Sequence, residues 1–310
     1  MNFNTDSVEV IKQGVADTLH TAAQTGGEHG EAGGNLFTQL LHHLKDSHEI
    51  EYPGGHLELP QFPPFHIGGL AIDLSITKHV VFLWLAAIIV ILITSAAARK
   101  NAKSLIPKGI GNLIEVFVQF IRDDVVIPNM GKSGLRYLPY LLTTFFFILI
   151  MNLLGMIPYG ASATGNVSVT LALAVIAFIM IQVSAIRAQG IGGYFAHLTG
   201  GVHWMLWPIM VPIEILGLFT KPFALCIRLF ANMTGGHIVI VSMLGLIFLF
   251  KSFLIAPASV GFVAAINMLE LFVAFLQAYI FTMLTSLFMG LGIKAAEEHH
   301  GHDAHAEHGH

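Results

Sequence analysis

The longest apolar run in this sequence, residues 204–250, limits the folds that are open to the chain. The hydrocarbon core of a bilayer is about 30 Å thick, and a helix that rises about 1.5 Å per residue crosses it in about 20 residues. One helix over the whole run would reach about 70 Å. We therefore expect a helix that is steeply tilted, bent or broken, and Pro208, Pro212 and Pro222 supply places to bend.

Arg228 lies near the middle of this run, where a charge is expensive. Estimates for an arginine at the bilayer centre range from ~3 to ~15 kcal/mol, and the guanidinium stays charged in proteins. One interpretation is a side chain that snorkels to a lipid headgroup, which suits Lys221 better than Arg228. We favour the other interpretation, a fixed positive charge that faces a water-filled path or a buried anionic partner.

The composition places the chain in a membrane. Only 11% of its 310 residues are charged, 55% are hydrophobic, and the mean hydropathy is +0.71. Soluble domains carry about 25% charged residues, so the sequence predicts an integral membrane protein. The net charge of −4 comes without a basic patch, which argues against a nucleic-acid partner. Cys226 is the single cysteine, so no disulfide can form within the chain, and we expect no cleaved signal peptide after Met1.

Five apolar segments are long enough to span a bilayer. They cover residues 77–98, 135–157, 167–186, 204–250 and 257–293. The last would form a helix of about 55 Å, so tilt is again forced, and we expect the last two segments to form a strongly tilted antiparallel pair. The predicted fold class is therefore all-α integral membrane, with about five membrane segments.

Residues 109–127 show a different pattern, with apolar side chains on one stripe and polar ones opposite. The stripe consists of Ile110, Leu113, Ile114, Phe117, Phe120 and Ile121. This pattern is typical of an amphipathic helix that lies in the membrane interface or packs on other helices there.

Three regions follow from these segments. Residues 1–66 form a polar tail and Gly/Pro-rich linker, residues 67–293 the membrane domain, and residues 294–310 a His-rich tail that we expect to be disordered. The histidines of both tails lack the spacing of a zinc site, so we expect no metal.

Nine Lys and Arg residues fall on one side of the predicted topology and four on the other. The richer side is expected to be cytoplasmic, which puts the N-terminus outside and the C-terminus inside a bacterial-type inner membrane.

Polar residues inside the last two segments suggest a path for protons. Asn232 lies four residues from Arg228, and Glu270 and Gln277 lie seven apart on one helix face. If the two helices pair antiparallel with Gln277 level with Arg228, Glu270 falls near the level of His237. The outcome is a titratable His–Glu pair on the outer approach and a layer of Arg228, Asn232 and Gln277 further in.

Glu214 lies fourteen residues before Arg228, on roughly the same face and nearer the inside, where it could line an exit. Structural alternatives stay open for the others. Glu270 and His237 could be a buried pair that fixes helix register, although intramembrane carboxylates are rare enough that we rank this second. Asn232 and Gln277 could equally be ordinary interhelical hydrogen bonds.

The run over residues 221–237, KPFALCIRLFANMTGGH, resembles the signature of subunit a of the F-type ATP synthase membrane sector. Other stretches that fit the same family are residues 269–281 (LELFVAFLQAYIF), 151–158 (MNLLGMIP), 166–170 (NVSVT) and 190–193 (GIGG). The resemblance covers roughly residues 67–293 in order, and its central motif is highly specific.

The resemblance implies a role for each matching residue. The family's essential arginine falls on Arg228, its asparagine on Asn232 and its glutamine on Gln277, and its histidine and acid fall on His237 and Glu270. It further implies two proton half-channels against a rotating ring of c subunits, with the arginine between them. The implied partners are that ring, the b subunits of the peripheral stalk and the rest of the complex. No cofactor and no active site for ATP are expected.

Two other classes of protein were weighed. An independent secondary ion transporter or channel often shows internal repeats, and no convincing repeat is present. An intramembrane metalloprotease would carry a His-Glu-x-x-His motif, which the sequence lacks, and a Walker-type loop for nucleotide binding is also absent.

Overall fold

The computed structural model describes residues 49–52, 55–58, 65–67, 70–72, 77–101, 109–157, 160, 163–198, 204–250 and 255–307. Most of the predicted polar tail, residues 1–48, lies outside the described residues. Two short antiparallel hairpins precede the membrane helices: β1 (Glu49–Tyr52) pairs with β2 (Gly55–Glu58), and β3 (Phe65–Ile67) with β4 (Leu70–Ile72). The sequence analysis took this Gly/Pro-rich stretch for a linker and missed the hairpins.

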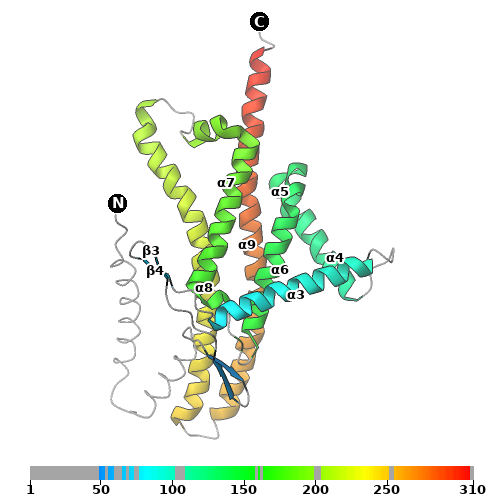
Figure 1. Ribbon diagram of the computed structural model, residues 1–310, viewed down its shortest axis with the longest axis vertical. Helices are drawn as coiled ribbons and strands as arrows, with labels where there is room; N and C mark the ends of the chain where they lie inside the picture. Colours follow the sequence, from blue (N-terminus) through cyan, green and yellow to red (C-terminus); the bar gives the residue numbers. More distant parts are fainter. Residues whose placement is uncertain are drawn as a thin grey trace. The chain divides into compact units, whose positions relative to one another are not determined.

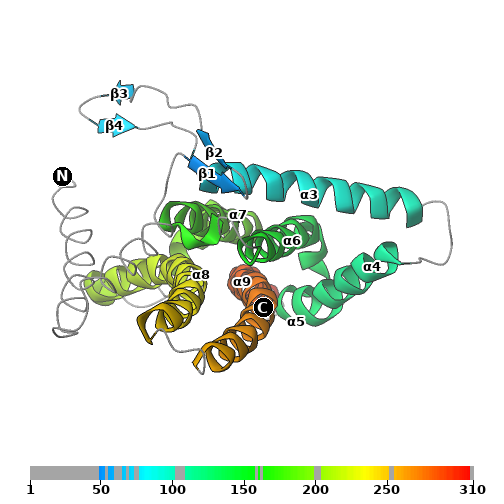
Figure 2. The ribbon, with the colours of Figure 1, turned by 90° about the horizontal axis from the view of Figure 1, so that it is seen from below.

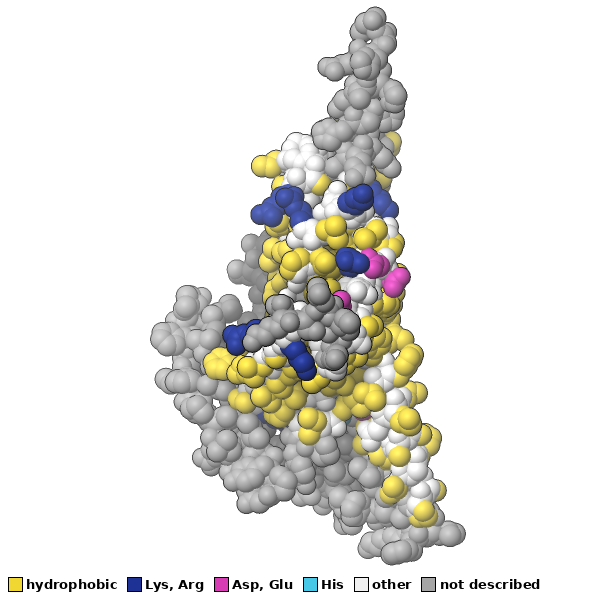
Figure 3. Space-filling model, turned by 90° about the vertical axis from the view of Figure 1, so that its right-hand side faces the viewer, with side chains coloured by type: hydrophobic (Ala, Val, Ile, Leu, Met, Phe, Trp, Pro, Cys, Tyr) yellow, Lys and Arg dark blue, Asp and Glu magenta, His cyan; other side chains and the backbone are white. Residues whose placement is uncertain are grey.

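Five described helices are long and apolar enough to cross a membrane, as predicted. They are α3 (Lys78–Asn101), α6 (Leu138–Gly155), α7 (Val167–Leu198), α8 (Trp207–Phe250) and α9 (Ile255–Glu307). Short 3₁₀ turns, η2 (Lys132–Tyr137), η3 (Ala163–Gly165) and η4 (Trp204–Leu206), precede α6, α7 and α8. Large apolar side chains are exposed on these helices, Trp84 and Leu92 among them, as a surface in contact with lipid requires. Hydrophobic side chains likewise dominate the described part of the face in Figure 3.

A glycine interrupts α7, whereas α8 continues without a break. Gly190 has φ 73° and ψ 167°, which interrupts α7 where the sequence analysis ended its third span, and a glycine adopts this conformation without a Cβ clash. α8, by contrast, stays one helix across Pro212 and Pro222. Its length therefore has to be accommodated by tilt or gentle bending.

The C-terminal tail corrects another expectation. α9 continues to Glu307, so the tail that we expected to be disordered is helical up to that residue. Residues 294–298 (KAAEE) are strong helix formers and carry the helix beyond the membrane span, which ends at Lys294.

The helices do not share one direction. α6, α7 and the part of α9 after residue 264 run side by side, whereas α3 crosses them, as Figures 1 and 2 show from two directions. These helices therefore cannot all stand along one membrane normal. The strong tilt of the last two segments stays a prediction that rests on helix length.

The amphipathic segment follows the predicted pattern only in part. It consists of α4 (Ile110–Phe120), the π-helical η1 (Ile121–Val126) and α5 (Ile127–Met130). Ile121 of the stripe is buried, whereas Ile110 and Leu113 are 67% and 54% exposed, as a helix in the membrane interface would leave them. The wider π-helical turn also buries Val125 and Val126, which regular α-helical spacing did not place on the stripe.

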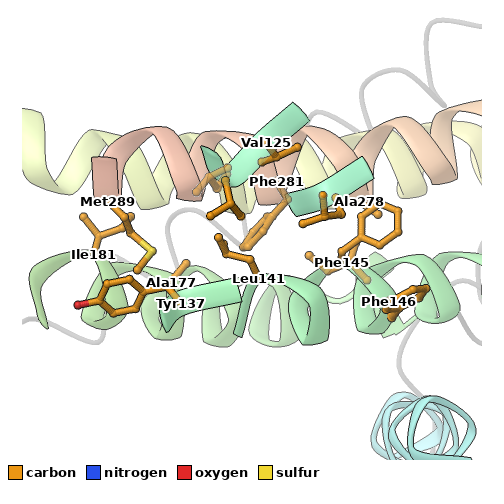
Figure 4. Close-up of a cluster of buried hydrophobic side chains, with 14 of the residues drawn as sticks. Val125, Tyr137, Leu141, Phe145, Phe146, Ala177, Ile181, Ala278, Phe281 and Met289 are labelled. Atoms are coloured by element: carbon orange, nitrogen blue, oxygen red, sulfur yellow. The ribbon is translucent and has the colours of Figure 1, made fainter. Parts of the chain in front are cut away.

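The core lies between α6, α7, α9 and the π-helix (Figure 4). Phe145 and Phe281 are its largest fully buried side chains, and the rings of Phe145 and Phe275 meet edge to face at 5.9 Å. A Cβ at Gly290 of α9 would collide with the backbone oxygen of Asn129, so this glycine permits close helix packing. The core therefore fixes the position of α9, the helix that carries Glu270 and Gln277.

Candidate functional site

The site begins with a hydrogen bond between α8 and α9. Asn232 Nδ2 donates to Gln277 Oε1 at 2.8 Å. Gln277 is only 3% exposed. The prediction placed Gln277 level with Arg228, and the structure gives it a partner one helical turn further along α8. Spacing along one helix fixes faces well, but it leaves the register between two helices open by about a turn.

Glu270 lies where the antiparallel pairing predicted, beside the end of the motif. Its side chain packs over Gly236, where a Cβ would lie 3.0 Å from Glu270 Oε1. Glu270 is only 5% exposed, and His237, the next residue after Gly236, is half-buried. Within the described residues neither carboxyl oxygen of Glu270 has a hydrogen-bond partner. The level is therefore as predicted, but no His237–Glu270 hydrogen bond forms.

A small cavity separates Glu270 from the Asn232–Gln277 pair. Its volume is about 10 Å³, close to the smallest space that holds one water molecule. Glu270, Gln277, Asn232 and Asn152 line it together with apolar residues of α8 and α9. An unpaired buried carboxyl group is costly, and one water in this cavity could hydrogen-bond to it and to the amide groups of the lining.

Asn152 on α6 is a member of this site that the sequence analysis did not single out. Its side chain is 1% exposed, accepts a bond from Thr164 Oγ1 at 2.8 Å and donates to the backbone oxygen of Ala274 at 3.2 Å. It thus holds α9 one turn from Glu270. The signal for it was an asparagine inside the apolar span of residues 135–157, outside the two long segments that hold the other site residues.

Arg228 is half-buried on α8, between the buried side chains of Leu225 and Leu229. In the described part of the chain its guanidinium makes no hydrogen bond and no ion pair. A cation at membrane depth is normally paired or hydrated. Among the described residues no acidic side chain pairs with Arg228, so such a partner would have to come from outside them.

The remaining predicted residues lie away from this cluster. Glu214 is half-buried on α8, fourteen residues and about 21 Å before Arg228. Lys221 has its Nζ 5.1 Å from the centre of the Phe288 ring, a cation–π contact with α9 that gives this lysine a structural partner. Asn267 is exposed.

Five long apolar helices, with the buried polar groups of Glu270, Gln277 and Asn152 among them, define a multi-pass membrane protein. A family model described as ATP synthase A chain matches residues 80–290. The chain belongs to this family, as the resemblance in its central motif indicated.

Relatives support the same assignment along most of the chain. "ATP synthase subunit a" of Chloroherpeton thalassium is 54% identical over 269 residues, 86% of this chain and 79% of the relative. "ATP synthase subunit a 2" of Chlorobaculum tepidum is 51% identical over 302 residues, 95% of this chain and 84% of the relative. "ATP synthase subunit a" of an Anaeromyxobacter species is 48% identical, over 91% of this chain and 76% of the relative.

Proposed function

We propose that this chain is the proton-conducting subunit of an F-type ATP synthase, with two half-channels that meet a ring of c subunits. The observation that carries the proposal is the Glu270, Gln277, Asn232 and Asn152 cluster around a water-sized cavity, in a member of this family. The chain itself makes no ATP in this proposal. It conducts protons, and catalysis takes place elsewhere in the complex.

The inlet begins on the outer side, at His237 and Glu270. The Glu270 carboxyl group has no hydrogen-bond partner among the described residues, so it is free to take and release a proton. A water in the adjoining cavity can bridge it to Gln277 and Asn232, whose amides both donate and accept. The proton then reaches a carboxylate that a c subunit presents at mid-membrane.

Arg228 stands between the two half-channels. At about 4 Å and an effective dielectric constant of about 20, two unit charges attract by about 4 kcal/mol, which corresponds to about three pKa units on the ring carboxylate. Arg228 therefore favours the ionised carboxylate and releases its proton on the exit side. The same positive charge repels a proton that would cross directly between the half-channels.

The exit lies on the cytoplasmic side, where Glu214 lines it. Orientation rests on the nine-to-four distribution of Lys and Arg, which puts the N-terminus outside and the C-terminus in the cytoplasm of a bacterial-type inner membrane. The remaining partners are the b subunits of the peripheral stalk, which hold this chain against the turning ring.

Replacement of Arg228 tests this assignment. Arg228→Ala in the whole complex should abolish ATP-driven proton pumping into membrane vesicles, because nothing would then separate the half-channels. The matched control is Lys221→Ala, which removes a cation of the same helix seven residues away and should leave pumping intact. Coupled pumping retained by Arg228→Ala would rule out the role given to this arginine.

An independent channel or transporter is the alternative that the sequence left open. It predicts that this chain, purified in mild detergent without any ring, conducts protons by itself. In our proposal the chain copurifies with a ring subunit and conducts only with it.

A further inference from the structure

A second cavity, far larger than the one at Glu270, lies between four helices of the described chain. Its volume is about 710 Å³, within the range of about 300–1,000 Å³ that is usual for sites of drug-sized ligands. α3, α6 and α9 contribute residues from their membrane-spanning parts, and α4 closes the fourth side. The proposed proton path uses none of these residues.

The lining of this cavity suits hydrocarbon. Of fifteen lining residues, fourteen are hydrophobic, and Thr94 is the exception. Thr94 Oγ1 already donates to the backbone oxygen of Val90 at 2.6 Å, so the lining offers little to a polar ligand. Phe117, Phe146 and Phe275 supply ring faces, and an unbranched chain fills such a space well.

The cavity is also open to its surroundings. Ile110, Met268 and Phe272, which all line it, are 67%, 77% and 63% exposed. Met268 and Phe272 belong to the membrane-spanning part of α9, so an exposed apolar surface beside the cavity is open to lipid. An acyl chain can therefore enter from the side without crossing a polar barrier.

Positive charge lies beyond one end of the cavity. Arg99 and Lys100 are exposed in the last turn of α3, and Lys100 follows the lining residue Ile93 by seven residues on the same helix face. That spacing puts Lys100 about 10 Å further along the helix, at the level where a headgroup would lie. Glu115 of α4, an acid near this end, is engaged by Asn101 Nδ2 at 3.4 Å.

We infer that this cavity binds one anionic phospholipid, with an acyl chain between α3, α4, α6 and α9 and the phosphate near Arg99 and Lys100. The hydrocarbon lining selects the chain, and the two cations select a negative headgroup. A transmembrane helix of a partner protein is the competing occupant, and the experiment below distinguishes the two.

The test uses the whole complex with a photoreactive benzoylphenylalanine at position 113, irradiated in native membranes. Mass spectrometry of this chain should find a phospholipid adduct. The same residue placed at Ile179, which is exposed on α7 outside the cavity and meets bulk lipid, should give adducts without enrichment in anionic phospholipid. An adduct with another protein chain at position 113, or the same lipid composition of the adducts at both positions, would overturn the inference.

Two variants test the parts of the site separately, by lipid copurification in mild detergent. Leu113→Trp fills the cavity and should lower the retained phospholipid about tenfold, whereas Ile179→Trp should leave it unchanged. Neutralising Arg99→Gln and Lys100→Gln should weaken retention of phosphatidylglycerol about fivefold per charge and leave phosphatidylcholine unaffected. Retention of phosphatidylglycerol that does not respond to either change would refute the site.

Discussion

Replacing Glu270 with glutamine separates a proton relay from a structural pair. The change keeps the size of the side chain and removes the group that titrates. Glu270 is 5% exposed, and neither of its carboxyl oxygens has a hydrogen-bond partner among the described residues. Glu270→Gln therefore breaks no hydrogen bond of the described structure, and the glutamine fits the same space over Gly236.

The magnitudes differ sharply between the two interpretations. Breaking a buried ion pair costs about 3–5 kcal/mol of stability, whereas exchanging one unpaired buried polar group for another should stay within about 1 kcal/mol. A positioned acid–base group typically contributes ~10²–10⁴-fold to proton transfer. We therefore expect Glu270→Gln to leave the thermal midpoint nearly unchanged and to slow proton flow at least about 100-fold.

The assay is passive proton flow through the membrane sector, ring included, in vesicles driven by a potassium diffusion potential. Asn267→Ala is the control, because Asn267 is an exposed amide on the same helix and lies outside the cluster. Thermal unfolding in detergent is measured on the same preparations. Equal proton flow in the two variants would refute the relay, and a large loss of stability in Glu270→Gln would favour the structural pair.

Two further predictions concern the packing that holds the site. Asn152→Leu removes the hydrogen bonds to Thr164 and Ala274, so it should cost about 1–3 kcal/mol of stability and also slow proton flow. Thermal midpoints measure the stability and the vesicle assay measures the proton flow. An unchanged midpoint would contradict the role of Asn152. Gly290→Ala should destabilise by about 1–3 kcal/mol, because its Cβ would meet backbone rather than a movable side chain. Its control is Gly217→Ala, which meets open space and should be neutral or slightly stabilising by the same melts.

Hydropathy and helical periodicity were sufficient for the coarse architecture. The five spans were all predicted, because each depends on properties of one segment alone. The level of Glu270 beside the end of the motif also followed, since antiparallel pairing converts sequence distance into height.

Features that depend on two segments at once were harder to predict. The bond between Asn232 and Gln277 was among the alternatives that the sequence left open, whereas Asn152 enters the site from a helix more than a hundred residues away in sequence. The π-helical turn that buries Val125 packs against α9, where Ser286 Oγ donates to the backbone oxygen of Val125. The spacing of apolar residues does not predict this turn. Such contacts are decided by side-chain fit, which one sequence does not reveal.

The small volume beside Glu270 has a consequence for what can travel through it. A space for a single water leaves no room for an ion that carries its own hydration shell, and four side chains offer few oxygen ligands to replace one. A proton needs no such room, because it moves by the exchange of bonds between neighbouring groups. In the proposed inlet, this cavity would therefore select by size. Protons would pass by transfer between neighbouring groups, and hydrated cations would be excluded.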